Sequence, residues 1–162
     1  MMMRIGVISD THLKGVSKEL QEIFFRYLGD AEMILHAGDF VSLEIVSFLG
    51  QKDFYGVCGN MDPPEVKRIL PHKRLLKLGE WKIGLIHGWG GPEGIEERIR
   101  GEFPDTDVIV YGHSHRSANH TTGGTLFFNP GAAMGFSSDG RHSIGVLTVG
   151  ERIQGEIIYI GS

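Results

Sequence analysis

The sequence has a single cysteine, Cys58, and no apolar run that approaches the length of a membrane-spanning helix. One cysteine cannot form a disulfide within the chain, which is typical of proteins from a reducing compartment. The first residues, Met1 to Arg4, lead directly into a strand-like segment, without the apolar core and small-residue cleavage site of a secretory signal. These absences predict a cytoplasmic protein with no membrane segment.

An excess of positive charge is also missing, because the formal net charge is -4. This balance argues against general nucleic-acid binding and against binding to anionic membranes, both of which favour a basic surface. It does not exclude a small phosphorylated substrate, since bound metal ions would reverse the local charge. The chain shows no linker, low-complexity stretch or sequence repeat, and its 162 residues suit one domain. We therefore expect a single domain over residues 1–162.

The chain does contain an alternation of strand-like and helix-like segments. Short apolar runs bounded by turn residues predict strands at 3–9, 33–36, 53–58, 74–78, 82–86, 107–111, 119–122, 125–129, 143–149 and 152–159. Apolar residues at helical spacing predict helices at 17–28, from Ser42 to 49, from Pro64 to 69, and around Ile95 and Ile99 with Pro92 in the first turn. The alternation predicts an α/β architecture of two sheets with helices outside.

Five of the apolar runs end beside a residue that can bind a metal. These candidate ligands are Asp10, His12, Asp39, Asn60, His87, His113 and His115. If the strands lie side by side, their carboxyl ends bring these side chains to one edge, where ligands collect in open α/β sheets. Nitrogen and oxygen ligands in this number suit a pair of divalent transition metals. The pattern indicates a two-metal hydrolytic site.

Each motif alone also has a structural explanation. An Asp in a turn, such as Asp10, often serves for backbone hydrogen bonds, and Asn60 can form an Asx turn before Pro63. His113 and His115 form the strongest local signal, because two imidazoles one residue apart can serve one metal or two adjacent ones. The joint occurrence of all five motifs after strand-like segments favours the functional interpretation.

The motif order Asp-x-His, Gly-Asp, Gly-Asn-x-Asp, His-Gly and Gly-His-x-His resembles the calcineurin-like metallophosphoesterase superfamily. The short chain and the later Asn129-Pro130-Gly131 resemble its small single-domain phosphodiesterase branch, often called YfcE-like. The resemblance extends from Asp10 to about Ala132. It implies a four-layer α/β/β/α sandwich of two mixed β-sheets flanked by helices, with the metal site at the carboxyl ends of the strands.

The resemblance also implies two ligand sets that share Asp39. Asp10, His12, Asp39 and His115 would hold one divalent metal, and Asp39, Asn60, His87 and His113 would hold the second. A hydroxide between the metals would then attack a small phosphodiester in line with its leaving oxygen, with Asp39, Asn60 and His87 at the catalytic centre. We expect manganese, with iron, nickel, zinc and cobalt as open alternatives. The resemblance further allows a homo-oligomer.

Met61 departs from the pattern of many family phosphatases. Those enzymes have a histidine after the Asn, paired with the next acid, as the proposed proton donor to the leaving group. Met61 cannot donate a proton, and Asp62 has no histidine to pair with. A general acid typically raises the rate by about a hundredfold or more, so its loss matters. The small phosphodiesterase branch commonly lacks this histidine, so Met61 favours diesters.

Two other functions remain open from the sequence. A phosphomonoesterase would need leaving-group protonation more strongly, and the same fold also serves as a non-catalytic protein-interaction scaffold in the retromer subunit that resembles this branch. The presence of every expected ligand favours an enzyme.

Three other residues have simpler structural interpretations. We interpret His36 as a core histidine rather than one that orients a ligand, and Cys58 as a small apolar residue. We interpret His120 as a surface residue that could border the substrate cleft.

Overall fold

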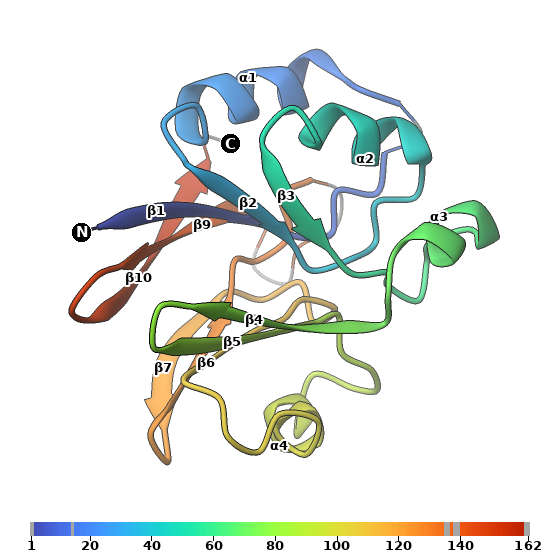
Figure 1. Cartoon of the computed structure of the whole chain (residues 1–162). Helices are drawn as coiled ribbons and strands as arrows, with labels where there is room; N and C mark the ends of the chain where they lie inside the picture. Colours follow the sequence, from blue (N-terminus) through green and yellow to red (C-terminus); the bar gives the residue numbers. More distant parts are fainter. Residues whose placement is uncertain (1, 14, 135–136, 138–139, 161–162) are drawn as a thin grey trace.

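Two five-stranded sheets lie face to face in the computed structural model, which describes residues 2–13, 15–134, 137 and 140–160 (Figure 1). The first sheet has the order β10 (Ile153–Ile160), β9 (His142–Val149), β1 (Met3–Ile8), β2 (Met33–His36) and β3 (Asp53–Gly56). The second has the order β4 (Lys73–Leu78), β5 (Trp81–Ile86), β6 (Val108–Val110), β8 (Thr125–Asn129) and β7 (Ala118–Thr122). The ends of the expected domain, residues 1, 161 and 162, lie outside the described residues.

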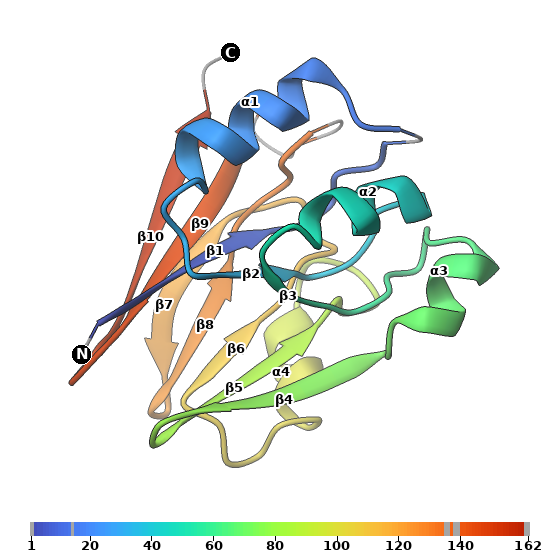
Figure 2. The ribbon, with the colours of Figure 1, turned by 45° about the horizontal axis from the view of Figure 1, so that its top comes forward.

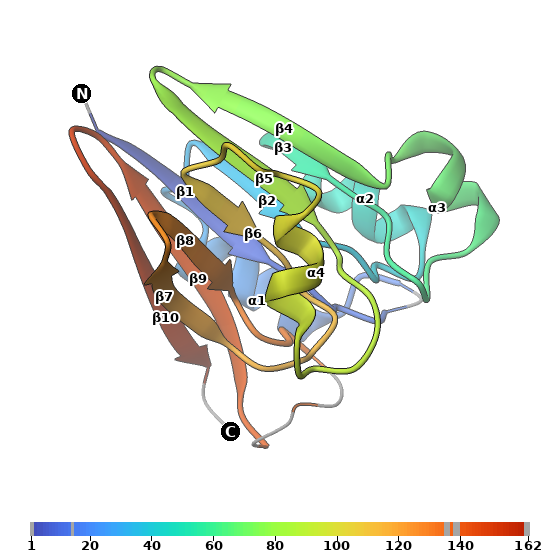
Figure 3. The same ribbon diagram turned by 90° about the horizontal axis from the view of Figure 1, so that it is seen from below.

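Both sheets mix parallel and antiparallel pairs. Strands β1, β2 and β3 are parallel, and β9 and β10 continue that sheet in antiparallel fashion. Strands β5, β6 and β8 are parallel, with antiparallel edges β4 and β7. Helices α1 (Lys18–Tyr27) and α2 (Leu43–Leu49) cover the first sheet, and α4 (Ile95–Arg100) covers the second (Figures 2 and 3). The expected four-layer sandwich of two mixed sheets is confirmed.

Strand alternation sorts the apolar side chains into separate core layers. Ile5 and Val7 of β1 pack between the two sheets, whereas Ile8 belongs to the layer beneath α1 and α2. A third layer places Ile95 and Ile99 of α4 against the outer face of the second sheet. Each of these side chains is almost fully buried, and such burial contributes about 1.5–3 kcal/mol to the free energy of unfolding.

The sequence placed most elements to within two residues, but the start of α4 was wrong. Pro92 does not lie in its first turn, because the helix begins at Ile95 after Gly94, whose φ of 77° interrupts the helical path. Helix α3 (Pro64–Ile69) does begin beside the Pro63-Pro64 pair, as expected. In the described part of the chain, no helix is both long enough and apolar enough to cross a membrane.

Strand β2 ends at His36, which is a fully buried core residue, as interpreted from the sequence. Its ring stacks on Phe40 with a centroid separation of 3.6 Å. Nδ1 accepts a hydrogen bond of 2.9 Å from the Gly38 N–H, and Nε2 lies 3.3 Å from the Thr11 hydroxyl. Burial lowers the pKa of His36 to about 3, because a charged imidazolium would lose its hydration there.

The neutral state of His36 predicts a specific loss of stability in acid. In the unfolded chain His36 takes up a proton near its ordinary pKa of 6.5, whereas the folded protein does not until about pH 3. Protonation therefore favours unfolding as the pH falls through this window, by up to about 1.4 kcal/mol per pH unit.

Denaturant titrations of wild type and His36→Asn at a series of pH values would measure this effect. The Asn side chain keeps an acceptor near the position of Nδ1 but does not titrate. We expect the variant to be less stable at pH 7 and to have a shallower pH dependence between about pH 6 and pH 4. Parallel curves for the two proteins would contradict the assignment.

Candidate metal centre

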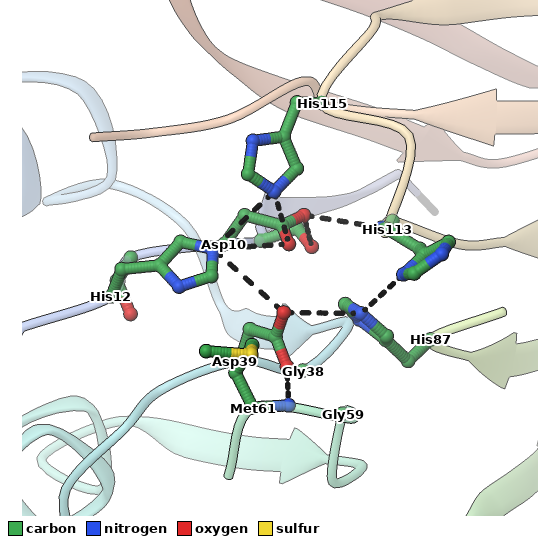
Figure 4. A network of polar contacts seen from close by, with 12 residues as sticks. Asp10, His12, Gly38, Asp39, Gly59, Met61, His87, His113 and His115 are labelled. Carbon is green, nitrogen blue, oxygen red and sulfur yellow. Dashed lines mark hydrogen bonds and ion pairs between the residues drawn. The ribbon is translucent and has the colours of Figure 1, made fainter. Parts of the chain in front are cut away.

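Six of the seven candidate ligands lie together in Figure 4, beyond the ends of parallel strands from both sheets: Asp10, His12, Asp39, His87, His113 and His115. The seventh, Asn60, contacts His87. Main-chain hydrogen bonds continue the pairing of β1 and β2 beyond the strands, from Asp10 N–H to the Gly38 carbonyl and from His12 N–H to the Asp39 carbonyl, both 3.0 Å. The Gly112 N–H likewise donates to the His87 carbonyl. The ligand-bearing loops are therefore fixed to one another by their own backbones.

The backbone at the ligands is strained. Six described residues other than glycine have a positive φ, and five of them are candidate ligands: Asp10 at 55°, His12 at 49°, Asp39 at 63°, His113 at 69° and His115 at 58°. This conformation costs a residue with a side chain roughly 1–2 kcal/mol. Strain concentrated in this way is typical of functional sites, where the surrounding structure holds residues in costly conformations.

The first group of ligand atoms belongs to Asp10, His12, Asp39 and His115, and these atoms all lie within 4.8 Å of one another. Nε2 of His12 and Nε2 of His115 are 3.3 Å apart. Oδ1 of Asp10 is 3.2 Å from the His115 nitrogen, yet it is buried and makes no well-formed hydrogen bond within the described residues. A buried oxygen without a hydrogen bond beside two converging imidazole nitrogens fits a divalent cation.

The second group lies on the other side of Asp39. Its Oδ2 is 3.3 Å from Nε2 of His87 and 3.7 Å from Nε2 of His12, so one carboxylate oxygen faces both groups. Oδ1 of Asn60 is 2.9 Å from Nε2 of His87 and 3.2 Å from Nδ1 of His113. His113 thus faces the second group and His115 the first, although only Ser114 separates them in the chain.

The polar atoms behind the ligands determine which ligand atoms face the centre. Oδ2 of Asp10 accepts from the Ser9 hydroxyl at 2.6 Å, and Oδ1 of Asp39 accepts from the Met61 N–H at 2.8 Å, so each carboxylate presents its other oxygen inward. Nδ1 of His87 lies 2.7 Å from the Ala37 carbonyl. A carbonyl accepts only from a protonated ring nitrogen, which places a proton on Nδ1, so Nε2 is the nitrogen that would offer its lone pair to a bound metal.

The charges of the site favour cation binding. Burial by itself would raise the pKa of Asp10, but the neighbouring imidazoles of His115 and His12 outweigh it and hold that pKa well below its usual range. Burial also acts to raise the pKa of Asp39, but the hydrogen bond and charge of His87, together with the Met61 N–H, more than offset it and lower that pKa. Both carboxylates are therefore ionised, which is the form that binds metals.

Two glycines allow the loops to approach this closely. A Cβ at Gly59 would stand 2.2 Å from Oδ1 of Asp39, and one at Gly112 would stand 2.1 Å from the Ser9 hydroxyl oxygen. No side chain could be accommodated at these distances without moving the ligands. The positions before Asn60 and His113 therefore have no room for a side chain, which is why glycine occupies both.

Asp62 has a role that the sequence analysis missed. Its buried carboxylate accepts main-chain hydrogen bonds from Asp39 at 3.0 Å, Val41 at 2.7 Å and Gly59 at 2.8 Å. It therefore ties the loop after β2 to the loop after β3. The spacing Gly-Asn-x-Asp held this signal, because an acid in a turn often accepts nearby backbone N–H groups.

The Met61 and His120 side chains both lie at the margin of the site. Met61 is 59% exposed, and its thioether can donate no proton. His120 borders an open cavity of about 370 Å³ that Ser114 also lines, and its Nε2 is 2.8 Å from Oε2 of Glu96. The position of His120 beside the His113–His115 loop agrees with its interpretation as a surface residue near the cleft.

Comparison with known proteins gives a consistent assignment. Residues 3–152 match the calcineurin-like phosphoesterase superfamily domain. A probable metallophosphoesterase from Methanothermobacter thermautotrophicus is 35% identical, over 99% of this chain and 94% of the relative.

Two solved structures also resemble this chain over nearly its whole length. One is of an archaeal phosphodiesterase, with a TM-score of 0.75 and 25% identity over 98% of this chain and 100% of the other. The second, vacuolar protein sorting 29 from Cryptosporidium parvum, has the same TM-score and identity over 99% of both chains. The family match, together with the relative's identity and coverage, leads to one conclusion: the chain belongs to the calcineurin-like phosphoesterase superfamily.

Proposed function

We propose that this protein is a dinuclear metal-dependent phosphodiesterase that hydrolyses small phosphodiesters. The observation that carries the proposal is the position of Asp39 Oδ2, which faces His12 on one side and His87 on the other. A carboxylate shared between two groups of nitrogen and oxygen donors suits two adjacent cations better than one. We also infer that residues 1–162 act as a single domain, since an apolar layer joins the two sheets.

The ligand assignment follows from which atoms face each other. Asp10, His12, Asp39 and His115 form the first set, and Asp39, Asn60, His87 and His113 form the second. The donors are imidazole nitrogens, carboxylate oxygens and one amide oxygen, which suit manganese, iron, nickel, zinc or cobalt. We take manganese as the first metal to test.

Two divalent cations, when bound, lower the pKa of water and neutralise charge on phosphoryl oxygens. Two cations with the carboxylates of Asp10 and Asp39 leave a local excess of positive charge, which attracts a phosphodiester monoanion to a protein of net charge -4. Asn60 turns its amide oxygen toward His87 and His113, so its NH₂ group is available to orient a phosphoryl oxygen.

The Met61 side chain favours diester substrates over monoester substrates. At this position the side chain is apolar and half in solvent, so it supplies no proton to a leaving alkoxide. A diester with a good leaving group departs without that help. A phosphomonoesterase remains the alternative enzyme, and the likeness to vacuolar protein sorting 29 supports a second alternative, a protein-interaction scaffold on the same fold.

One prediction of the proposed function concerns the substrate. Protein stripped with chelator and restored with manganese should hydrolyse bis(p-nitrophenyl) phosphate faster than p-nitrophenyl phosphate, and the stripped protein should hydrolyse neither. The release of p-nitrophenolate measures both rates. A faster monoester rate would favour the phosphomonoesterase, and two bound metals without turnover, with manganese and the alternative metals, would favour the scaffold.

Another prediction of the proposed function concerns the shared carboxylate. Asp39→Asn removes the charge that faces both ligand groups, so we expect fewer than two bound metals and a loss in kcat/KM of at least about a hundredfold. Met61→Ala, on the neighbouring exposed side chain, should change kcat/KM by less than about threefold. Metal analysis and steady-state kinetics check both variants, and equal small effects would refute the shared role of Asp39.

A further inference from the structure

The loop between β5 and α4 carries little side-chain packing of its own. Four of the seven residues from Gly88 to Gly94 in this loop are glycines, and Trp89 to Gly94 are exposed. Gly88, Gly90 and Gly94 have φ values of 101°, 82° and 77°, so the backbone follows a path that most side chains disfavour. A loop of this composition needs contacts from elsewhere to hold one conformation.

Arg98 of α4 supplies those contacts. Its Nε donates to the Trp89 carbonyl at 2.9 Å, its Nη1 donates to the Glu93 carbonyl at 3.1 Å, and its Nη2 donates to the Gly91 carbonyl. The guanidinium is planar and its donors have fixed directions, so the three bonds define the path of the loop. A Cβ at Gly90 would stand 2.9 Å from Cζ of Arg98, which shows how closely the backbone wraps this group.

The same loop orients a candidate metal ligand. Nε2 of His113 lies 2.8 Å from the Gly90 carbonyl, and a carbonyl accepts only from a protonated ring nitrogen. The proton on Nε2 leaves the lone pair on Nδ1, which faces Oδ1 of Asn60 and Nε2 of His87. A chain of contacts therefore runs from Arg98 through the loop to the ring of His113.

We propose that Arg98 is a positioning residue for the second metal: it holds the Gly90 carbonyl where that group fixes the tautomer and ring orientation of His113. The assignment of His113 to a metal rests on the proposed function. The contacts that connect Arg98 to His113 do not depend on it. Contacts of this kind behind metal ligands are typically worth about 10–100-fold in metal affinity.

Arg100 provides a matched control on the same helix. Its Nη2 also donates to main-chain carbonyls, those of Thr122 and Gly123, both at 3.1 Å, but these lie at the end of β7 and in the turn that follows it. Arg98→Ala and Arg100→Ala thus each remove a guanidinium that bonds main-chain carbonyls. Only Arg98→Ala removes bonds to the loop that contacts His113. Arg98→Lys keeps the charge without the planar donors and should behave like Arg98→Ala.

The experiment is a titration of metal-free protein with manganese against a competing chelator, together with nitrogen-15 spectra of the histidine rings. We expect Arg98→Ala to weaken the second equivalent by about tenfold or more and the first by less than about twofold, with a mixed tautomer at His113. Arg100→Ala should retain both affinities and the single tautomer. Wild-type behaviour of Arg98→Ala, or equal losses in both alanine variants, would overturn the proposal.

The two proposals fail in different ways. If the wild-type protein takes up only one metal, the dinuclear function is wrong, and the His113 tautomer in metal-free protein then decides the role of Arg98. If the wild type binds two metals and hydrolyses diesters while Arg98→Ala keeps the affinity and tautomer of the wild type, the function stands and the positioning role is wrong.

Discussion

The Asp39 carboxylate holds the centre together through both of its oxygens. Oδ1 accepts from the Met61 backbone and so joins the loop after β2 to the loop after β3, while Oδ2 faces His12 and His87. Asp62 reinforces the same junction from the other direction, by accepting the N–H groups of Asp39 and Gly59. These two carboxylates connect loops that the sheet alone would only bring near each other.

This arrangement depends on parallel strands in both sheets. Because β1, β2 and β3 run the same way, their following loops emerge at one edge, and β5 and β6 bring His87 and His113 to that edge from the second sheet. The apolar layer between the two sheets fixes how one sheet lies on the other. Packing between the sheets therefore positions the candidate ligands that follow β5 and β6 against those that follow β1, β2 and β3.

The sequence predicted the strands, the sandwich and the meeting of the candidate ligands at one edge because these depend on local pattern: apolar runs, glycines and the polar residue that follows each run. The local pattern alone could not predict which imidazole faces which neighbour, since His113 and His115 diverge through two left-handed backbone conformations, and that assignment came only from the family resemblance. The start of α4 was wrong because Pro92 is a common first-turn residue, whereas Gly94 interrupts the helix. The Gly-Asn-x-Asp pattern carried a signal for the local bond from Gly59 to Asp62. The bonds from Asp39 and Val41 to Asp62 join segments far apart in the chain, and those of Arg98 span a loop, so no local pattern carries them.

The positive φ values of the candidate ligands have a consequence for the stability of the protein in a cell. Five left-handed residues at one edge of the sheets are a cost to the fold. On the proposed function, a metal at a concentration a hundred times its dissociation constant adds about 2.7 kcal/mol per site to the free energy of unfolding. The population of folded protein, and its resistance to degradation, would then follow the supply of metal, so that scarcity removes the protein as well as its activity.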